Sequence, residues 1–175
     1  MGAKGQDGHC VSVGPASGQA AGPLAHVVLL TPEIPQNAGN VGRSCLAFGA
    51  QLHLVRPLGF SLASSALRRA GLDYWEHVNP VVWPSWEALE LELPRLGEPF
   101  FFSAEGELSL FEVTLSPVPV LIFGRESTGL PGELRQRFRH RLVRIPMVSG
   151  PVRSLNLATS AGIVLAELFR QRVAE

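Results

Sequence analysis

Three segments of the chain hold polar residues whose types and spacing suit the binding of a phosphate or a ribose. In the first, Asn37, Asn40 and Arg43 recur every three residues, so in a helix they would lie near one face. Backbone N–H groups at a helix start, together with amides and a guanidinium, suit such a ligand. The alternative is an Asn-capped helix with a solvated arginine. The segment has neither the glycine spacing of a dinucleotide site nor the lysine of a P-loop.

The second segment is the glycine-flanked sequence Phe123-Gly-Arg-Glu-Ser-Thr-Gly-Leu-Pro131. Its Ser127 follows Gly124 by three residues, one more than in the nucleophile elbow of hydrolases, and no His–Asp pair follows in the expected order. A hydrolase is therefore not indicated. Gly124 and Gly129 suggest that the backbone lies close to a ligand. We expect Glu126 to accept a hydrogen bond from a sugar or an amino group, or else to pair with an arginine.

The third segment runs from Arg144 to Thr159 and is rich in proline, glycine and small polar residues. Its prolines and glycine favour a stiff, irregular backbone before Ser154 or Asn156 begins the final helix. Capping that helix explains only one of these two residues. The other, together with Arg153, is then available for binding.

The 15 basic and 15 acidic residues cancel, which excludes the uniformly basic surface typical of non-specific nucleic-acid binding. The two signs are nevertheless separated along the chain. From Asp73 to Glu112 nine acidic residues accompany one arginine, whereas from Arg125 to Arg172 nine arginines accompany three glutamates. This separation indicates either a local anion-binding face or a solvated charge pattern. The densest group of basic residues in the sequence marks either an RNA contact or a solvated helix end. It comprises Arg135, Arg137, Arg139, His140, Arg141 and Arg144.

Short apolar runs alternate with helix-like segments from His26 onwards, and these elements must position the three segments. Strands are expected at His26–Leu30, Gln51–Val55, Pro99–Phe102, Val118–Phe123 and Leu142–Ile145, with a weaker one at His77–Val82. Helices are expected at Ala38–Phe48, Ser85–Leu93, Pro131–Phe138 and Leu155–Arg172. The alternation predicts an α/β fold in which helices cover both faces of one parallel sheet. Ligands of such sheets bind beyond the carboxyl ends of the strands, and the loops Thr31–Asn40, Gly124–Pro131 and Pro146–Arg153 leave those ends.

The length of 175 residues fits a single domain with a proper core. Residues 1–24 are poor in large apolar side chains, so we expect a disordered tail before a folded domain over residues 25–175. The absence of a long apolar run predicts a protein without a membrane helix. Two cysteines are too few for a disulfide framework, which favours a cytoplasmic protein. The five histidines and two cysteines lack metal-ligand spacing, so no metal site is expected.

Taken in order, the three segments resemble the motifs of the SPOUT class of RNA ribose 2′-O-methyltransferases. These motifs are an Asn–Arg segment after the first strand, a Phe-Gly-x-Glu-x-x-Gly-Leu loop, and Ile-Pro-Met followed by Ser-x-Asn-Leu. Within the class the chain is similar to the small enzymes that methylate the wobble ribose of certain tRNAs, through Pro32–Asn40, Pro57–Phe60 and Leu67–Tyr74. The resemblance covers about His26 to Arg172. The chain departs from the pattern at Arg125, at Ser127-Thr128, and at Ser149–Val152, which is one residue longer than usual.

The resemblance implies a C-terminal trefoil knot, a homodimer, and S-adenosylmethionine as methyl donor without a metal. It assigns the cofactor contacts to Phe102, Gly124, Ile145 and Ser154, and the catalytic set to Asn37, Arg43, Glu126 and Asn156. The RNA contacts would be Asn40, Arg43 and Arg153. The implied substrate is the wobble cytidine or modified uridine of a tRNA. Methylation of another tRNA or rRNA ribose, or a non-catalytic cofactor- or RNA-binding module, remain the alternatives.

Overall fold

The computed structural model describes residues 22–62, 74–148 and 150–173. The expected disordered tail, 1–24, lies outside these residues except for its last three. Of these, Leu24 already belongs to the fold, because its N–H donates to the carbonyl of Gly49 at 2.8 Å and its side chain packs against the core. Most of the Leu67–Tyr74 motif also lies outside the described residues.

Seven parallel strands form one sheet in the order β3-β2-β1-β6-β4-β7-β5. The strands are β1 (His26–Leu30), β2 (Gln51–Val55), β3 (Val81–Trp83), β4 (Glu98–Phe102), β5 (Leu108–Ser109), β6 (Pro119–Phe123) and β7 (Leu142–Arg144). The central strands are apolar and buried on both faces, as expected for a parallel sheet covered by helices.

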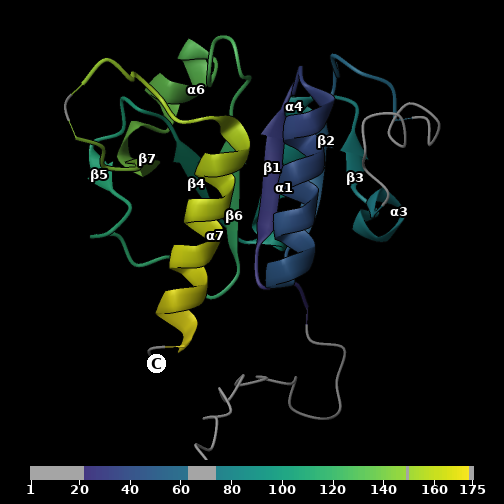
Figure 1. Cartoon of the computed structure of the whole chain (residues 1–175), viewed down its shortest axis with the longest axis horizontal. Coiled ribbons are helices and arrows are strands. Elements are labelled where there is room, and N and C mark those ends of the chain that lie inside the picture. Colours follow the sequence, from purple (N-terminus) through teal and green to yellow (C-terminus); the bar gives the residue numbers. More distant parts are fainter. Residues whose placement is uncertain (1–21, 63–73, 149, 174–175) are drawn as a thin grey trace, which may run out of the picture.

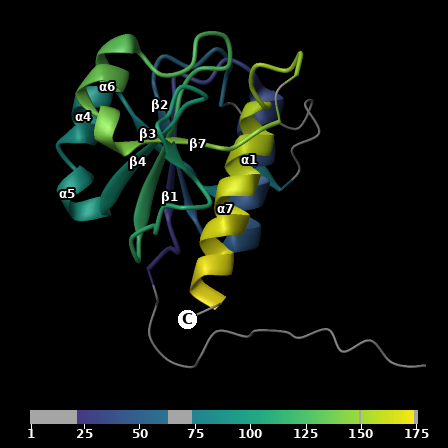
Figure 2. The same ribbon diagram turned by 90° about the vertical axis from the view of Figure 1, so that its left-hand side faces the viewer.

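Helices cover both faces of this sheet. They are α1 (Pro35–Phe48), α3 (Trp75–Val78), α4 (Trp86–Glu90), α5 (Leu93–Leu96), α6 (Gly132–Arg137) and α7 (Leu157–Val173), with a 3₁₀ turn at Arg139–Arg141. Figure 1 shows α1 and α7 side by side, and Figure 2 shows α4, α5 and α6 on the opposite side of the sheet. The predicted α/β sandwich is therefore confirmed, whereas the trefoil knot stays a prediction. None of the described helices is long and apolar enough to cross a bilayer.

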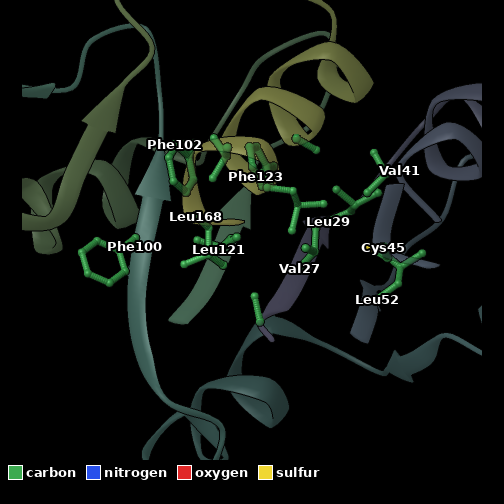
Figure 3. Close-up of a cluster of buried hydrophobic side chains, with 14 of the residues drawn as sticks. Val27, Leu29, Val41, Cys45, Leu52, Phe100, Phe102, Leu121, Phe123 and Leu168 are labelled. Carbon is green, nitrogen blue, oxygen red and sulfur yellow. The ribbon is translucent and has the colours of Figure 1, made fainter. Parts of the chain in front are cut away.

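Side chains that alternate along the strands divide the core into two layers. Val27 and Leu29 of β1 face α1 and α7, where they meet Val41 and Leu168 (Figure 3). Val28 of β1 belongs to the opposite layer, which packs against the other helices. Because the five central strands β2, β1, β6, β4 and β7 contribute to both layers, the two helical layers hold the sheet from both sides.

Three regions differ from the sequence prediction. The two-residue edge strand β5 was not expected, because it carries no apolar run and pairs only with β7. The weak strand expected at His77–Val82 is instead the short helix α3 followed by β3, and Asn79 between them has a φ of 42°. The helix expected at Ser85–Leu93 is two short helices. Ser85 caps the first, accepting a hydrogen bond from the N–H of Ala88 at 3.4 Å. The second begins at Leu93 with Pro94 in its first turn, and a proline has no N–H to continue the preceding helix.

The carboxyl ends of four neighbouring strands bring the three polar segments together. In register, Leu29 of β1 pairs with Phe123 of β6, which pairs with Phe102 of β4, which pairs with Val143 of β7. The loops that follow these strands consequently emerge at one edge of the sheet. Figure 1 shows the start of α1, α6 and the segment leading into α7 at the same end of the molecule.

Candidate active site

A cavity of about 550 Å³ opens at this edge, between the loops that follow β1, β4, β6 and β7. Its apolar wall includes Phe102, Phe123, Val143 and Ile145. Seven residues that the sequence singled out line it: Asn37, Phe102, Gly124, Glu126, Ile145, Ser154 and Asn156. They come from all three polar segments and from the end of β4. Asn40, Arg43 and Arg153, the expected RNA contacts, are not part of its lining.

A chain of side-chain hydrogen bonds links the three segments across the cavity. The buried Asn37 donates from Nδ2 to Oε1 of Glu126 at 3.2 Å and accepts from Nδ2 of Asn156 at 2.9 Å. The Asn156 carbonyl in turn accepts from the N–H of Ala158 at 2.8 Å, which caps α7. Each amide is therefore held in one orientation by its neighbours. The relay fixes the start of α1 relative to the start of α7.

Two carboxylates clamp the first and second segments to each other. Glu126 accepts from the backbone N–H groups of Glu33 and Ile34, at 2.8 and 3.2 Å. In return, Glu33 accepts from the backbone N–H of Ser127 at 3.1 Å. Hydrogen bonding from the side chain of Ser127, and less from its backbone N–H, lowers the pKa of the Glu33 carboxyl. The clamp explains why Glu126 lies beside the cavity without pairing with an arginine.

Sequence reasoning missed Glu33 and the role of Arg125. The Arg125 Nε donates to Oγ1 of Thr31 at 3.1 Å and lies 3.9 Å from Oε1 of Glu33. Thr31 itself has a positive φ of 47°, at the sharp turn where the chain leaves β1. The sequence marked Glu33 only as the single acidic residue of the first segment. Its hydrogen-bond partner Ser127 lies more than 90 positions away, so the contact could not be predicted from neighbouring residues.

Gly124 is required by a close approach of backbone to backbone. A Cβ at this position would lie 2.1 Å from the carbonyl carbon of Gly129. The two ends of the second segment are bridged there, with reciprocal hydrogen bonds between Arg125 and Gly129 at 3.1 and 2.8 Å. The loop thus closes on itself beside the cavity. This is a different reason for the glycine than the expected approach to a ligand.

The structure shows which of Ser154 and Asn156 caps the final helix. Asn156 is the residue that caps α7, also accepting from the N–H of Thr159 at 3.4 Å. Ser154 lines the cavity and is exposed. No hydrogen bond among the described residues joins its hydroxyl to the start of α7, so this side chain is a candidate for binding a ligand in the cavity.

Arg43 lies on the exposed side of α1, away from the cavity lining. Its guanidinium carbon stands 4.2 Å from the centre of the Tyr74 ring, a cation–π contact. Asn37 and Arg43 are both on α1 but differ in burial, because six residues turn the helix by about 240° beyond one full turn. The spacing that appeared to favour a shared face places them on different sides.

The dense arginine group is paired with glutamates from other elements. Arg135 pairs with Glu105, Arg137 with Glu90, Arg139 with Glu107 and Arg141 with Glu98. Arg144 donates to the backbone carbonyls of Gly106 and Glu107. The acidic and basic stretches of the sequence therefore neutralise each other in the fold. In the described residues, no group of three or more histidines, cysteines or acidic residues is placed to hold a metal ion.

The chain is similar to known proteins in sequence and in fold. The model of the SpoU rRNA Methylase family matches residues 25–166. A tRNA (cytidine(34)-2'-O)-methyltransferase from Methylovorus glucosotrophus (strain SIP3-4) is 44% identical over 147 residues, which cover 83% of this chain and 94% of that protein.

Two solved structures resemble the whole fold. One, described as giving structural insights into the 2-OH methylation of C/U34 on tRNA, has a TM-score of 0.79 and 51% identity, covering 86% of this chain and 97% of the other. The second is an AdoMet-bound rRNA methyltransferase from Sinorhizobium meliloti, with a TM-score of 0.69 and 26% identity, covering 87% of this chain and 61% of the other.

Proposed function

Because the chain belongs to the SpoU rRNA methylase family, we propose that it methylates the ribose 2′-oxygen of nucleotide 34 of tRNA, a cytidine or uridine, with S-adenosylmethionine as donor. The observation that carries the proposal is the cavity lined by Asn37, Glu126, Ser154 and Asn156 together, in a chain 44% identical to a tRNA (cytidine(34)-2'-O)-methyltransferase. A tRNA substrate also favours a cytoplasmic location for this protein.

The cavity has the character that S-adenosylmethionine requires. Its volume of about 550 Å³ falls within the usual 300–1,000 Å³ range of small-molecule sites. Phe102, Phe123 and Ile145 offer apolar surface to an adenine, while the hydroxyl of Ser154 is available for a polar group. When bound, the cofactor supplies an electrophilic methyl group. The residues of the chain must then orient the ribose and assist the removal of the proton from its 2′-hydroxyl.

The hydrogen-bond relay gives Asn37 and Glu126 a positioning role. Asn37 is held by partners from the two other segments, and Glu126 by three donors of the first segment, so the cavity wall is rigid before any ligand binds. Holding the 2′-oxygen near ~3 Å from the methyl group can by itself supply several kcal/mol of the barrier. A preorganised wall is what such placement needs.

We assign to Arg43 the binding of the nucleotide and the stabilisation of charge that develops on its 2′-oxygen. A guanidinium has a pKa above ~12 and makes a poor general base. A permanent cation brought next to the 2′-oxygen favours its alkoxide-like charge in the transition state. The side chain is exposed and stacked on Tyr74, so it is free to meet RNA from the solvent side.

We further propose a homodimer formed by α1 and α7. These helices pack side by side, and their outer surface exposes Leu46, Phe169 and Val173, with exposed fractions of 43%, 42% and 63%. Phe48 contacts Phe169 at the same surface, with ring centres 5.7 Å apart. Such an apolar patch across two neighbouring helices suits an isologous contact.

The test is methyl transfer from labelled S-adenosylmethionine to tRNA from a host that lacks wobble-ribose methylation. The product is digested with nuclease and mapped by mass spectrometry, with Arg43→Ala as the control variant. A 2′-O-methyl group at nucleotide 34 that is lost in the variant supports the proposal. Methylation at a different ribose would contradict the wobble assignment and keep the chemistry. Failure with every tRNA and rRNA offered, despite tight cofactor binding, would favour a non-catalytic module.

A further inference from the structure

The arginines of the described residues differ in what their guanidinium groups contact. Seven lie within ion-pair distance of a carboxylate: Arg95, Arg125, Arg135, Arg137, Arg139, Arg141 and Arg170. Two donate to backbone carbonyls: Arg144 and Arg172. Within residues 22–62, 74–148 and 150–173, only Arg43, Arg56 and Arg153 lack both kinds of partner, and all three are exposed.

The paired arginines offer little net attraction to a phosphate. The strip formed by Arg135, Arg137, Arg139 and Arg141 carries one glutamate for each arginine. A phosphate that approaches this strip meets positive and negative charges whose attraction and repulsion largely cancel. What remains is screened by salt beyond a Debye length of about 10 Å at 0.1 M. To bind there it would also have to displace a carboxylate. The strip is therefore poorly suited to contact RNA, in spite of its density of arginines in the sequence.

Arg56 lies at the edge of the sheet that carries the cavity. It directly follows β2, and the carbonyl of Val55 at the end of that strand accepts from the N–H of Thr31 at 2.9 Å. The segment then turns back over the first loop, where the N–H of Gly59 donates to the carbonyl of Pro32 at 2.9 Å. A Cβ at Gly59 would lie 2.7 Å from the Glu33 backbone, so this segment packs tightly on the clamp.

We propose that Arg56 binds a phosphate of the RNA substrate, and that the phosphate-binding surface is the rim of Arg43, Arg56 and Arg153 and not the arginine strip. Arg56 directly follows β2, Arg153 lies in the segment that leads into α7, and Arg43 lies on α1, which begins at the carboxyl edge of the sheet. An exposed guanidinium without an internal carboxylate is free to take a phosphodiester in a bidentate contact. The proposal rests on the proposed function, because it takes tRNA as the substrate.

Salt-dependent binding of the full chain to labelled tRNA tests this assignment. Each phosphate contact that releases counterions contributes about 0.7–0.9 to the slope of log Kd against log salt concentration. Arg56→Gln is expected to reduce that slope by about this amount and to weaken binding several-fold at 0.1 M salt. Arg139→Gln changes the net charge equally but removes a paired arginine, and is expected to keep the wild-type slope. Arg56→Lys should restore most of the slope.

Cofactor binding measured by calorimetry should be the same in all of these proteins, since neither Arg56 nor Arg139 lines the cavity. A wild-type slope in Arg56→Gln would overturn the proposal. So would an equal loss in Arg139→Gln, because the strip would then contact RNA. Wild-type protein that binds tRNA but methylates none of it would contradict the proposed function and leave the Arg56 contact standing. A wild-type protein that does not bind tRNA would overturn both.

Discussion

Glu126 contributes most to the shape of the site at the scale of single residues. Its two oxygens accept from the N–H groups of Glu33 and Ile34 and from the amide of Asn37. A glutamine offers one acceptor oxygen, and its NH₂ group would face another donor. We expect Glu126→Gln to lower the free energy of unfolding by about 1–3 kcal/mol and to weaken cofactor binding, since a polar group would be left unsatisfied.

The matched control for that variant is Glu33→Gln, on the other side of the same clamp. Glu33 accepts from a single backbone N–H, and its side chain is 37% exposed. A glutamine can turn its carbonyl oxygen toward Ser127 and leave its amide in water. Urea unfolding and titration calorimetry compare the two variants. Equal losses in both would contradict the central role given to Glu126.

Substitution of Arg43 is expected to affect catalysis but not cofactor binding. Arg43 does not line the cavity, so Arg43→Ala is expected to leave the dissociation constant of S-adenosylmethionine unchanged while the methylation rate falls below a tenth of wild type. Arg43→Lys should recover only part of that rate, because a point charge replaces a planar group poorly. Single-turnover rates and calorimetry on the same preparations measure both quantities. A variant that retains more than a tenth of the rate would contradict the assigned role.

At the scale of elements, the start of α7 serves both the helix and the site. The carbonyl of Asn156 caps the helix and its amide donates to Asn37. An aspartate keeps the cap but replaces the donor with an acceptor. Asn156→Asp is therefore expected to lower methylation strongly and to stay more stable than Asn156→Ala, which loses the hydrogen bond to Asn37 as well as about 1 kcal/mol of capping. Thermal unfolding beside the methylation assay distinguishes these outcomes, and equal stability of the two variants would exclude the cap.

The neighbouring strands β1 and β2 hold a histidine pair, of which His53 is buried and His26 half-buried. Trp83 donates to Nδ1 of His53 at 3.0 Å, so His53 carries its proton on Nε2, which lies 2.9 Å from Nδ1 of His26. Burial lowers the pKa of His26, and burial together with the nearby His26 lowers the pKa of His53 to about 4. Both rings are therefore neutral at pH 7.

This pair predicts a loss of stability in mild acid. The unfolded chain takes up a proton on His53 near pH 6.5, whereas the folded chain resists it down to about pH 4. The free energy of unfolding should fall as the pH drops through this window, by up to about 3 kcal/mol from His53. His53→Gln keeps one donor and one acceptor without titrating, so its pH profile should be flatter. Urea unfolding at pH 7 and pH 4.5 measures the difference, and parallel profiles would contradict it.

At the scale of the whole molecule, the two helical layers have different surfaces. The layer of α1 and α7 exposes an apolar patch, while the other layer carries the arginine–glutamate strip. A charge within the patch should prevent the proposed homodimer. We expect Phe169→Glu to sediment as a monomer and Leu91→Glu, at an exposed position outside the patch, to sediment like the wild type. Analytical ultracentrifugation checks both, and a dimeric Phe169→Glu would place the contact elsewhere.

The amino-acid sequence by itself determined most of the elements and pointed to the loops at one edge of the sheet as the candidate site. Strands such as His26–Leu30 and Gln51–Val55 could be predicted to the residue, because continuous apolar runs between glycine- and proline-rich loops are local signals. The loops rich in asparagine and glycine were recognisable for the same reason. Parallel strand order then requires those loops to meet at one edge.

Only the tertiary structure decided which charged side chains are paired with one another inside the fold. The reciprocal contacts of Glu33 and Glu126 join positions more than 90 residues apart. The glutamates that neutralise the arginine strip likewise come from distant elements, so counting charges along the chain could not separate Arg56 from Arg139. Side-chain pairing depends on which strands become neighbours, and that order is set by packing of the whole sheet rather than by any local pattern.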